Sequence, residues 1–164
     1  LILITSGRPV FYRQERIGKN GHPYSMIKYR TMVRDAEQNG VAVPAAENDA
    51  RATGIGRLLR KTHLDEIPQF YNVLKGEMSM VGPRAERPEI IEQLQKDIPF
   101  YRARLFVKPG LTGWAQINYG YAAGSEMNSI KLEYDLYYIK HRNLILDFMI
   151  MTRTIGAIVF LRGR

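Results

Sequence analysis

The chain has 164 residues, 45% of them hydrophobic, which suffices for one domain with a buried core and is too short for two ordinary domains. Twenty-four Lys and Arg against 16 Asp and Glu give a net charge of +8, which favours an anionic partner such as nucleic acid, a nucleotide phosphate or a lipid surface. The sequence has no cysteine, which excludes disulfides and Cys-ligated zinc, and its three histidines lack metal-ligand spacing, so a bound metal would be a hard cation held by carboxylates.

The chain begins with the apolar residues Leu1 to Ile4, without a Met or a basic segment before them. Four apolar residues cannot span a bilayer, which takes about 20, and they do not make a signal peptide. The tail of a hydrophobic segment preceding residue 1 and a short first strand are equally good interpretations.

A β-hairpin is predicted over residues 9–30. A short β-type run at 9–18 is followed by Asn-Gly turn chemistry at 19–22 and by a second strand. In that strand Lys28 and Arg30 share one face, because strand side chains alternate. Two adjacent cations can grip a phosphate, although the pattern alone favours an exposed strand face.

The next segments are a polar insertion and a basic helix. Residues 35–53 are small, polar and rich in Ala, which indicates a mobile insertion. A short helix follows, with apolar side chains at helical spacing on one flank and Arg57, Arg60 and Lys61 on the other.

Asp65 and Glu66 form an adjacent acidic pair behind these cations. Thr62, three residues before Asp65, resembles a capping residue and predicts a helix with both acids in its first turn, where the helix dipole favours anions and phosphates. Adjacent helical side chains point about 100° apart, so one carboxylate would face a reacting centre and the other a metal or an orienting partner. The alternative is a capped helix with solvated acids, which the spacing alone favours.

Two features follow the acidic pair. Apolar residues at i, i+3, i+4 and i+7 over residues 67–74 predict a core-facing helix that anchors the acids. Residues 77–84 form a short apolar segment that closes on a Gly-Pro turn and presents Arg84. A stiff turn suits a guanidinium that contacts phosphate or carboxylate.

The second half of the chain is predicted to be largely helical. Helices are expected at 88–96 and 125–141, with a glycine-punctuated loop at 108–118 that enters a short strand and packs Trp114. Short strands among several helices, without regular βαβ alternation, predict a small α+β domain dominated by helix.

The tail at 144–161 is strongly apolar but contains Asp147 and Arg153. These charges argue against a membrane-spanning helix. An amphipathic helix that lies on the core or in the membrane interface fits the tail better.

Together these segments resemble the bacterial sugar transferase family, the monotopic polyprenyl-phosphate phosphoglycosyl transferases that begin exopolysaccharide and glycoconjugate assembly. The Leu-Asp-Glu-Ile-Pro-Gln block at 64–69, followed by Val-Gly-Pro-Arg at 81–84, is highly specific. The matching segments cover nearly the whole chain in family order: 7–18, 28–32, 56–76, 78–84, 108–118 and 134–138.

The resemblance implies transfer of a sugar 1-phosphate from a nucleotide diphosphate sugar, expected to be a UDP-sugar, to undecaprenyl phosphate, with release of the nucleoside monophosphate. Asp65 matches the nucleophile, which forms an aspartyl phosphosugar intermediate. Glu66 matches the partner acid associated with Mg²⁺, so Asp65 and Glu66 are the expected metal ligands. Transfer in two steps, through the covalent intermediate on Asp65, would let two large substrates use one site in turn.

Further site residues follow from the same resemblance. The basic positions that match those holding the diphosphate or the acceptor phosphate are Lys28, Arg60 and Arg84, with Arg57 a weaker match. Asp135 and Asp147 fall at matching acidic positions and are expected to support the site, although the resemblance assigns no specific role to either.

The chain departs from the family in two places. Many members carry Asn-Gly-Arg where Asn118 is here followed by Tyr-Gly-Tyr, so a cation expected to contact substrate is missing or supplied elsewhere, and the sugar or nucleotide preference stays open. Members also have an N-terminal membrane helix, to which only residues 1–4 could belong. The resemblance therefore implies that residues 1–164 are the catalytic domain of a longer protein at the cytoplasmic face of the bacterial inner membrane.

Two other functions compete with this one. A basic, non-enzymatic module that binds anionic lipid or nucleic acid is supported by the net charge and by the aromatic and Arg residues at 101–106, although no segment resembles a nucleic-acid-binding motif. A metal-dependent phosphohydrolase using the same acids would deliver the sugar phosphate to water.

Overall fold

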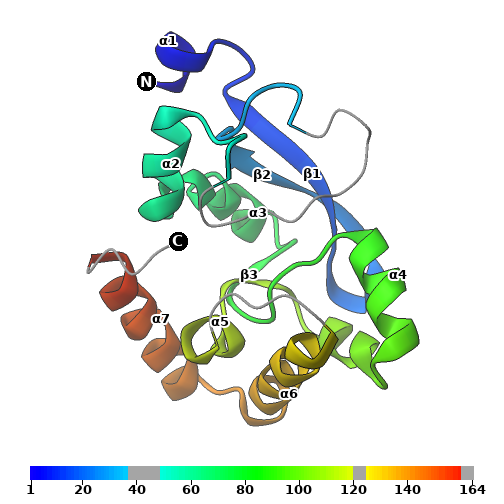
Figure 1. Ribbon diagram of the computed structural model, residues 1–164. Coiled ribbons are helices and arrows are strands. Elements are labelled where there is room, and N and C mark those ends of the chain that lie inside the picture. The colour runs from blue at the N-terminus through cyan, green and yellow to red at the C-terminus, as the bar shows by residue number, and fades with distance from the viewer. Residues whose placement is uncertain (37–48, 120–124, 160–164) are drawn as a thin grey trace.

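A computed structural model describes residues 1–36, 49–119 and 125–159 (Figure 1). It confirms a small, helix-dominated α+β domain with a short antiparallel hairpin. The elements are α1 (Ile2–Ser6), β1 (Phe11–Ile17), η1 (Lys19–Gly21), β2 (Pro23–Tyr29), α2 (Gly54–Lys61), η2 (Leu64–Glu66), α3 (Gln69–Leu74), β3 (Ser79–Val81), α4 (Pro88–Asp97), η3 (Tyr101–Phe106), β4 (Gly110–Thr112), α5 (Trp114–Asn118), α6 (Ser125–His141) and α7 (Leu144–Val159), where η marks a 3-10 helix.

Two predictions from the sequence fall largely outside the described residues. These are the polar insertion, of which 37–48 are not described, and the departure from the family after Asn118, which runs into 120–124. The described helices include none with the length and hydropathy that crossing a bilayer requires.

The hairpin is confirmed, since β1 and β2 pair antiparallel along their whole length. Asn20 adopts a left-handed backbone with φ 57° in the turn, which Asn tolerates better than most residues. The buried side chains Tyr24 and Met26 of β2 join Met78 and Ala85 in one part of the core. The hairpin is thereby packed against the segment that leads into β3.

A second sheet consists of β3 and β4, which pair in parallel. The Gly110 N–H donates to the Pro83 carbonyl at 2.9 Å, and a Cβ on Gly110 would lie 2.1 Å from the Gly82 nitrogen, so only glycine permits this approach. The contact fixes the Gly-Pro turn before Arg84. The loop predicted at 108–118 differs in one respect. Its short strand β4 comes before Trp114, and Trp114 begins the short helix α5.

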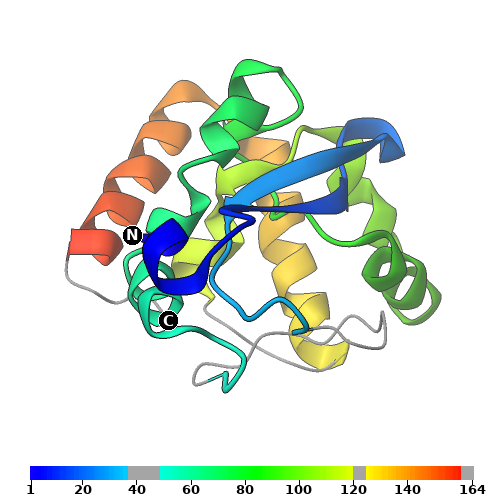
Figure 2. The same cartoon turned by 90° about the horizontal axis from the view of Figure 1, so that it is seen from above.

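The predicted helices of the second half are confirmed as α4, α6 and α7. The side chains that join α4, η3 and α6 form a buried cluster: Ile91, Leu94, Ile98, Tyr101, Leu105 and Leu132. In both views α4 lies on the right, whereas α1, α2 and α7 lie on the left (Figures 1 and 2).

The predicted helix start at Thr62 is wrong. The Thr62 hydroxyl donates to the Leu58 carbonyl at 2.9 Å, so Thr62 ends α2 and does not begin a helix. His63 then turns the chain with a left-handed φ of 55°. Asp65 and Glu66 lie in the separate 3-10 turn η2, ahead of α3.

The predicted core-facing stripe is also wrong, because α3 turns its apolar side outward. Leu74 is 86% exposed, whereas Asn72 is fully buried and Gln69 nearly so. The buried face of α3 meets the backbone of β2, which requires polar partners there. The exposed apolar residues of this segment are Ile67, Phe70, Tyr71 and Leu74.

Asn72 ties α3 to the hairpin. Its amide nitrogen donates to the Ser25 carbonyl at 2.9 Å and to the Glu77 carboxylate at 2.7 Å, and its amide oxygen accepts the Ile27 N–H at 3.2 Å. These are three bonds at a site without solvent, so each lost partner leaves a buried polar group unsatisfied.

We expect Asn72→Ala to lower the free energy of unfolding by about 2–4 kcal/mol, because Ser25, Glu77 and Ile27 lose their partner in the interior. Chemical denaturation measures the loss. Gln93→Ala, which removes an exposed amide from α4, is the control and should cost less than about 0.5 kcal/mol. Equal losses in the two variants would contradict a structural role for the Asn72 bonds.

Candidate active site

The centre of the site is an acid–cation cluster of Asp65, Glu66, Lys28 and Arg84. Lys28 Nζ donates to Glu66 Oε1 at 2.6 Å, and Arg84 Nη2 lies 3.5 Å from the same oxygen. Lys28 comes from β2, the acids from η2 and Arg84 from the turn after β3. Three separate segments therefore converge on one carboxylate.

Glu66 is kept ionised by this arrangement. Burial by itself raises the pKa of Glu66, but Lys28 and Arg84 outweigh burial and hold that pKa well below its usual range. Charge-assisted bonds of this kind fix a carboxylate as an acceptor. Glu66 is thus a permanent anion between two cations.

Asp65 has the opposite environment. Its side chain is 8% exposed, and burial raises its pKa above the usual value, with the Lys28 charge opposing and the Glu66 charge adding to the rise. Two neighbouring carboxylates whose pKa values are pushed apart by their surroundings can take different roles in one reaction. The two carboxylates thus have different surroundings, and the division of roles expected from the sequence stays a prediction.

Arg84 is held by a buried network that the sequence analysis missed. Arg104 Nη2 donates to the Arg84 carbonyl at 2.9 Å, and the same guanidinium grips Asp135 Oδ2 at 2.8 and 3.0 Å. Its Nη1 also donates to the Tyr101 hydroxyl at 3.1 Å. Arg104 and Asp135 are 31 residues apart, so no local pattern could have paired them.

Asp135 therefore acts through Arg104 on the backbone of Arg84, and it is a positioning residue in this structure. Asp147 lies elsewhere, where its Oδ1 accepts a bond from the Tyr138 hydroxyl at 2.9 Å. The two acidic positions that the family resemblance grouped together thus have separate surroundings.

The two α2 arginines are placed differently from Lys28 and Arg84. Arg57 is exposed and Arg60 half-buried on α2. Within the described part of the chain, the ion pairs of Glu66 are with Lys28 and Arg84. The cations paired with Glu66 in these contacts thus come from the hairpin and the β3 turn.

Lys28 and Arg30 have different roles, although they follow one another on a strand face. Arg30 is buried, and its Nη2 donates to the carbonyls of Ser6 and Gly7 at 2.6 Å each. The interpretation as an exposed strand face is wrong. Arg30 donates to the carbonyls at the end of α1, and Lys28 forms an ion pair with Glu66.

The residues at the site fit a hard divalent cation. Among the described residues no three His, Asp or Glu side chains gather as a metal cluster. Mg²⁺ is commonly held by one or two carboxylates together with substrate phosphates, however, so a larger cluster is not needed. Lys28 and Arg84 contact Oε1 of Glu66, which leaves Asp65 and Glu66 Oε2 as the ligands on offer.

A largely buried anion between two cations, beside a carboxylate of raised pKa, makes a site suited to a phosphate-bearing substrate. The model of the bacterial sugar transferase family matches residues 1–161. The chain therefore belongs to the bacterial sugar transferase family.

Curated relatives agree with this assignment. The chain is 44% identical over 159 residues to a UDP-N-acetylgalactosamine-undecaprenyl-phosphate N-acetylgalactosaminephosphotransferase of Aeromonas hydrophila, covering 97% of this chain and 37% of the relative. It is 41% identical over 156 residues to a UDP-glucose:undecaprenyl-phosphate glucose-1-phosphate transferase of Xanthomonas campestris pv. campestris, covering 93% and 32%.

A third relative is matched over most of its length. The exopolysaccharide production protein ExoY of Rhizobium meliloti (strain 1021) is 34% identical over 177 residues, covering 99% of this chain and 76% of the relative. The chain spans only about a third of the length of the Aeromonas and Xanthomonas relatives, at 37% and 32%.

We expect Asp65→Asn to raise the melting temperature near neutral pH. The raised pKa means that folding favours the protonated carboxyl, so the neutral form stabilises the fold at low pH and this stabilisation is lost as pH rises through the folded pKa. Asparagine removes the cost of the buried charge. A gain of about 1 kcal/mol would raise Tm by about 2–4 °C in a chain of this size.

Thermal unfolding of both proteins across pH checks this expectation, and the gain should shrink as pH falls and vanish below about 3, where Asp65 is protonated in both the folded and the unfolded chain. Asp97→Asn, at an exposed position of α4, is the control. A lower Tm for Asp65→Asn at neutral pH would overturn this account of the Asp65 environment.

Proposed function

We propose that this chain transfers a sugar 1-phosphate from a UDP-sugar to undecaprenyl phosphate, the first membrane step of exopolysaccharide or glycoconjugate synthesis. The observation that carries the proposal is the acid–cation cluster, in which Lys28 and Arg84 converge beside a buried Asp65. The relatives named for UDP-sugars and undecaprenyl phosphate support the choice of substrates.

In the proposed first step, a carboxylate oxygen of Asp65 attacks the sugar-proximal phosphorus of the UDP-sugar. A bond from Asp65 to phosphorus forms, the bond from that phosphorus to the bridging oxygen breaks, and UMP leaves with the electron pair. The raised pKa of Asp65 supports this role, because a carboxylate that its site stabilises poorly gains by sharing its charge with phosphorus.

In the proposed second step, a phosphate oxygen of undecaprenyl phosphate attacks the same phosphorus. The bond to Asp65 breaks and the carboxylate is restored. Lys28 and Arg84 stabilise the negative charge that the phosphoryl oxygens carry in both transfers, since such transfers depend mainly on positioning and charge neutralisation. Arg57 and Arg60 lie on the adjacent α2 and are candidates for a more distant phosphate.

Mg²⁺ is the proposed cofactor, with Asp65 and Glu66 as its protein ligands. When bound, it would supply further positive charge to the diphosphate. Glu66 suits this position because Lys28 and Arg84 hold it as an anion at all working pH values.

The proposed membrane contact rests on exposed large apolar side chains carried by α1, α2, α3 and α7, of which α1, α2 and α7 lie on the left of both views (Figures 1 and 2). A surface of this kind marks a membrane or protein contact, and an interfacial helix presents such residues to the bilayer. We place the protein on the cytoplasmic face of the inner membrane, where it would lie without spanning. The exposed residues lie in or next to α1, α2, η2, α3 and α7: Leu1, Leu3, Ile4, Leu58, Leu64, Ile67, Phe70, Tyr71, Leu74, Leu144, Ile145, Phe148 and Ile155.

We expect Asp65→Asn to reduce UMP release at least about 10³-fold when a UDP-sugar, Mg²⁺ and undecaprenyl phosphate are supplied, because the amide cannot act as the nucleophile. The assay is best run on the full-length protein in detergent micelles. Asp97→Asn is the control and should retain full turnover.

The same assay separates the rival functions. A phosphohydrolase would release UMP equally well without the lipid acceptor and form free sugar phosphate. A non-enzymatic binding module would release no UMP, and its binding to anions would survive Asp65→Asn. Either result would count against the transferase proposal.

We expect Ile145→Ser/Phe148→Ser to weaken binding to neutral phosphatidylcholine vesicles at least about 30-fold, because two large apolar side chains lose their burial in the bilayer. Co-sedimentation with vesicles measures the change. Phe100→Ser/Phe106→Ser removes two exposed aromatic side chains from a different part of the surface and should change binding less than about twofold. Matching losses in both variants would rule out a membrane contact specific to α7.

A further inference from the structure

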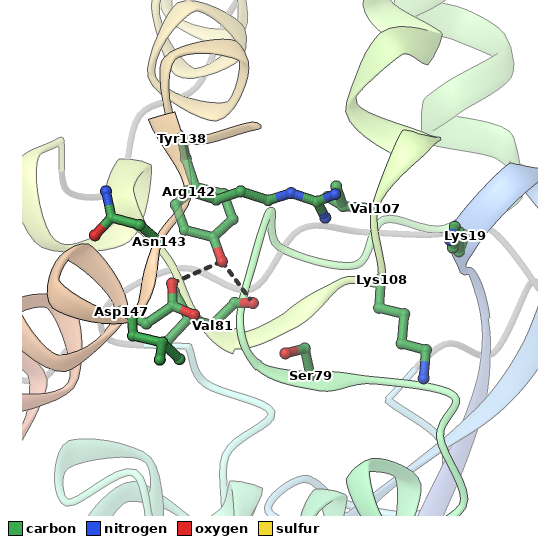
Figure 3. Close-up of a pocket in the computed structure, with 10 residues that line it drawn as sticks. Lys19, Ser79, Val81, Val107, Lys108, Tyr138, Arg142, Asn143 and Asp147 are labelled. Atoms are coloured by element: carbon green, nitrogen blue, oxygen red, sulfur yellow. Dashed lines mark hydrogen bonds between the residues drawn. The ribbon is translucent and has the colours of Figure 1, made fainter. Parts of the chain in front are cut away.

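A cavity of about 390 Å³ lies where the end of α6 and the start of α7 meet η1, β3 and the segment before β4 (Figure 3). No member of the acid–cation cluster lines it. The cavity is therefore separate from the proposed site of chemistry, and the transfer reaction as described gives it no role.

Three cations from distant parts of the chain line this cavity: Lys19 in η1, Lys108 before β4 and Arg142 between α6 and α7. In Figure 3 Arg142 extends from the junction of α6 and α7 toward Val107, and Lys108 projects from the wall opposite. Across the described ranges none of the three forms a salt bridge. Their charge is left for a ligand to neutralise.

One carboxylate lines the cavity, and it is already engaged. Asp147 Oδ1 accepts the hydroxyl of Tyr138 at 2.9 Å, and the same hydroxyl lies 3.2 Å from the Val81 carbonyl (Figure 3). The cavity also includes the start of α7, where Asn143 Oδ1 accepts the Leu146 N–H at 2.9 Å. The helix dipole adds positive potential there.

The rim of the cavity is apolar on the side of α7. Leu144, which lines the cavity, is 87% exposed, and Ile145 and Phe148 continue the exposed face along the same helix. A small soluble anion has no apolar part that could pack against this rim. A lipid, by contrast, has an anionic headgroup and apolar chains in the same molecule, so it matches both the cations and the rim.

We propose that the cavity binds the phosphate headgroup of an anionic phospholipid, whose acyl chains run along the exposed face of α7. Lys19, Lys108 and Arg142 contact the phosphate, and the bound lipid fixes the depth and the rotation of the domain at the bilayer surface. This inference rests on the membrane contact in the proposed function, but not on the transfer chemistry.

The test compares binding to two kinds of vesicle, pure phosphatidylcholine and vesicles in which about a third of the lipid is phosphatidylglycerol. Each Lys or Arg near an anionic surface is worth about fivefold in binding, so Lys108→Gln/Arg142→Gln should weaken binding to the anionic vesicles about 25-fold. Binding to neutral vesicles should stay within about twofold. The single variant Lys19→Gln, in an exposed turn, should lose about fivefold and guards against a folding defect in the double variant.

Lys96→Gln/Arg13→Gln is the matched control, because it removes the same two charges from exposed positions that do not line the cavity. Charges outside the cavity do not contact the bound phosphate and are screened by salt, so this control should lose less than about threefold at 0.1 M salt. An equal loss in the control, or an equal loss on neutral vesicles, would overturn the proposal.

Equilibrium dialysis with UMP and with inorganic phosphate distinguishes other sources of the anion. If Lys108→Gln/Arg142→Gln abolishes binding of either soluble anion and leaves vesicle binding intact, the cavity is not a headgroup site. UMP release in neutral detergent should be unchanged in this variant. Loss of anionic-vesicle binding with normal turnover supports the inference, whereas an inactive wild-type protein would defeat the proposed function without affecting the vesicle result.

Discussion

The contact between Lys28 and Glu66, 2.6 Å long and nearly buried, is the interaction on which the rest of the site depends. It joins β2 to the turn η2 across 38 residues of sequence. A buried charge without its partner costs several kcal/mol, so neither residue can leave while the other stays. Because Glu66 is fixed in this way, its neighbour Asp65 is held at a defined position with its carboxylate in a poorly solvating environment.

Two polar networks in the interior hold the ends of this contact. Asn72 bonds α3 to the backbone of β2 and so fixes the position of the strand that carries Lys28. Arg104, itself bound to Asp135, donates to the carbonyl of Arg84. Polar residues occupy the buried face of α3, and its apolar residues face outward. One cause, the docking of α3 on a strand backbone, therefore accounts for both the rigid site and the apolar surface beside it.

The sequence predicted the hairpin, α4, α6 and α7 because their periodicity and turn residues act locally. It failed around Thr62, because His63 adopts a left-handed backbone that no propensity anticipated. It also failed for α3, since an apolar stripe looks the same whether it faces a core or lies on the surface. Asp65, Glu66, Lys28 and Arg84 were named through a family resemblance, but Arg104 needed the fold, which alone brings it to Asp135.

The covalent step at Asp65 is the central claim, and its most direct test is the mass of the protein itself. Full-length protein given a UDP-sugar and Mg²⁺ without acceptor, then quenched and digested with trypsin, should yield the peptide Thr62–Lys75 carrying one sugar phosphate, with fragmentation placing it on Asp65. Undecaprenyl phosphate should remove the adduct. An active sample with an unmodified peptide, or with the adduct on Glu66, would contradict the account.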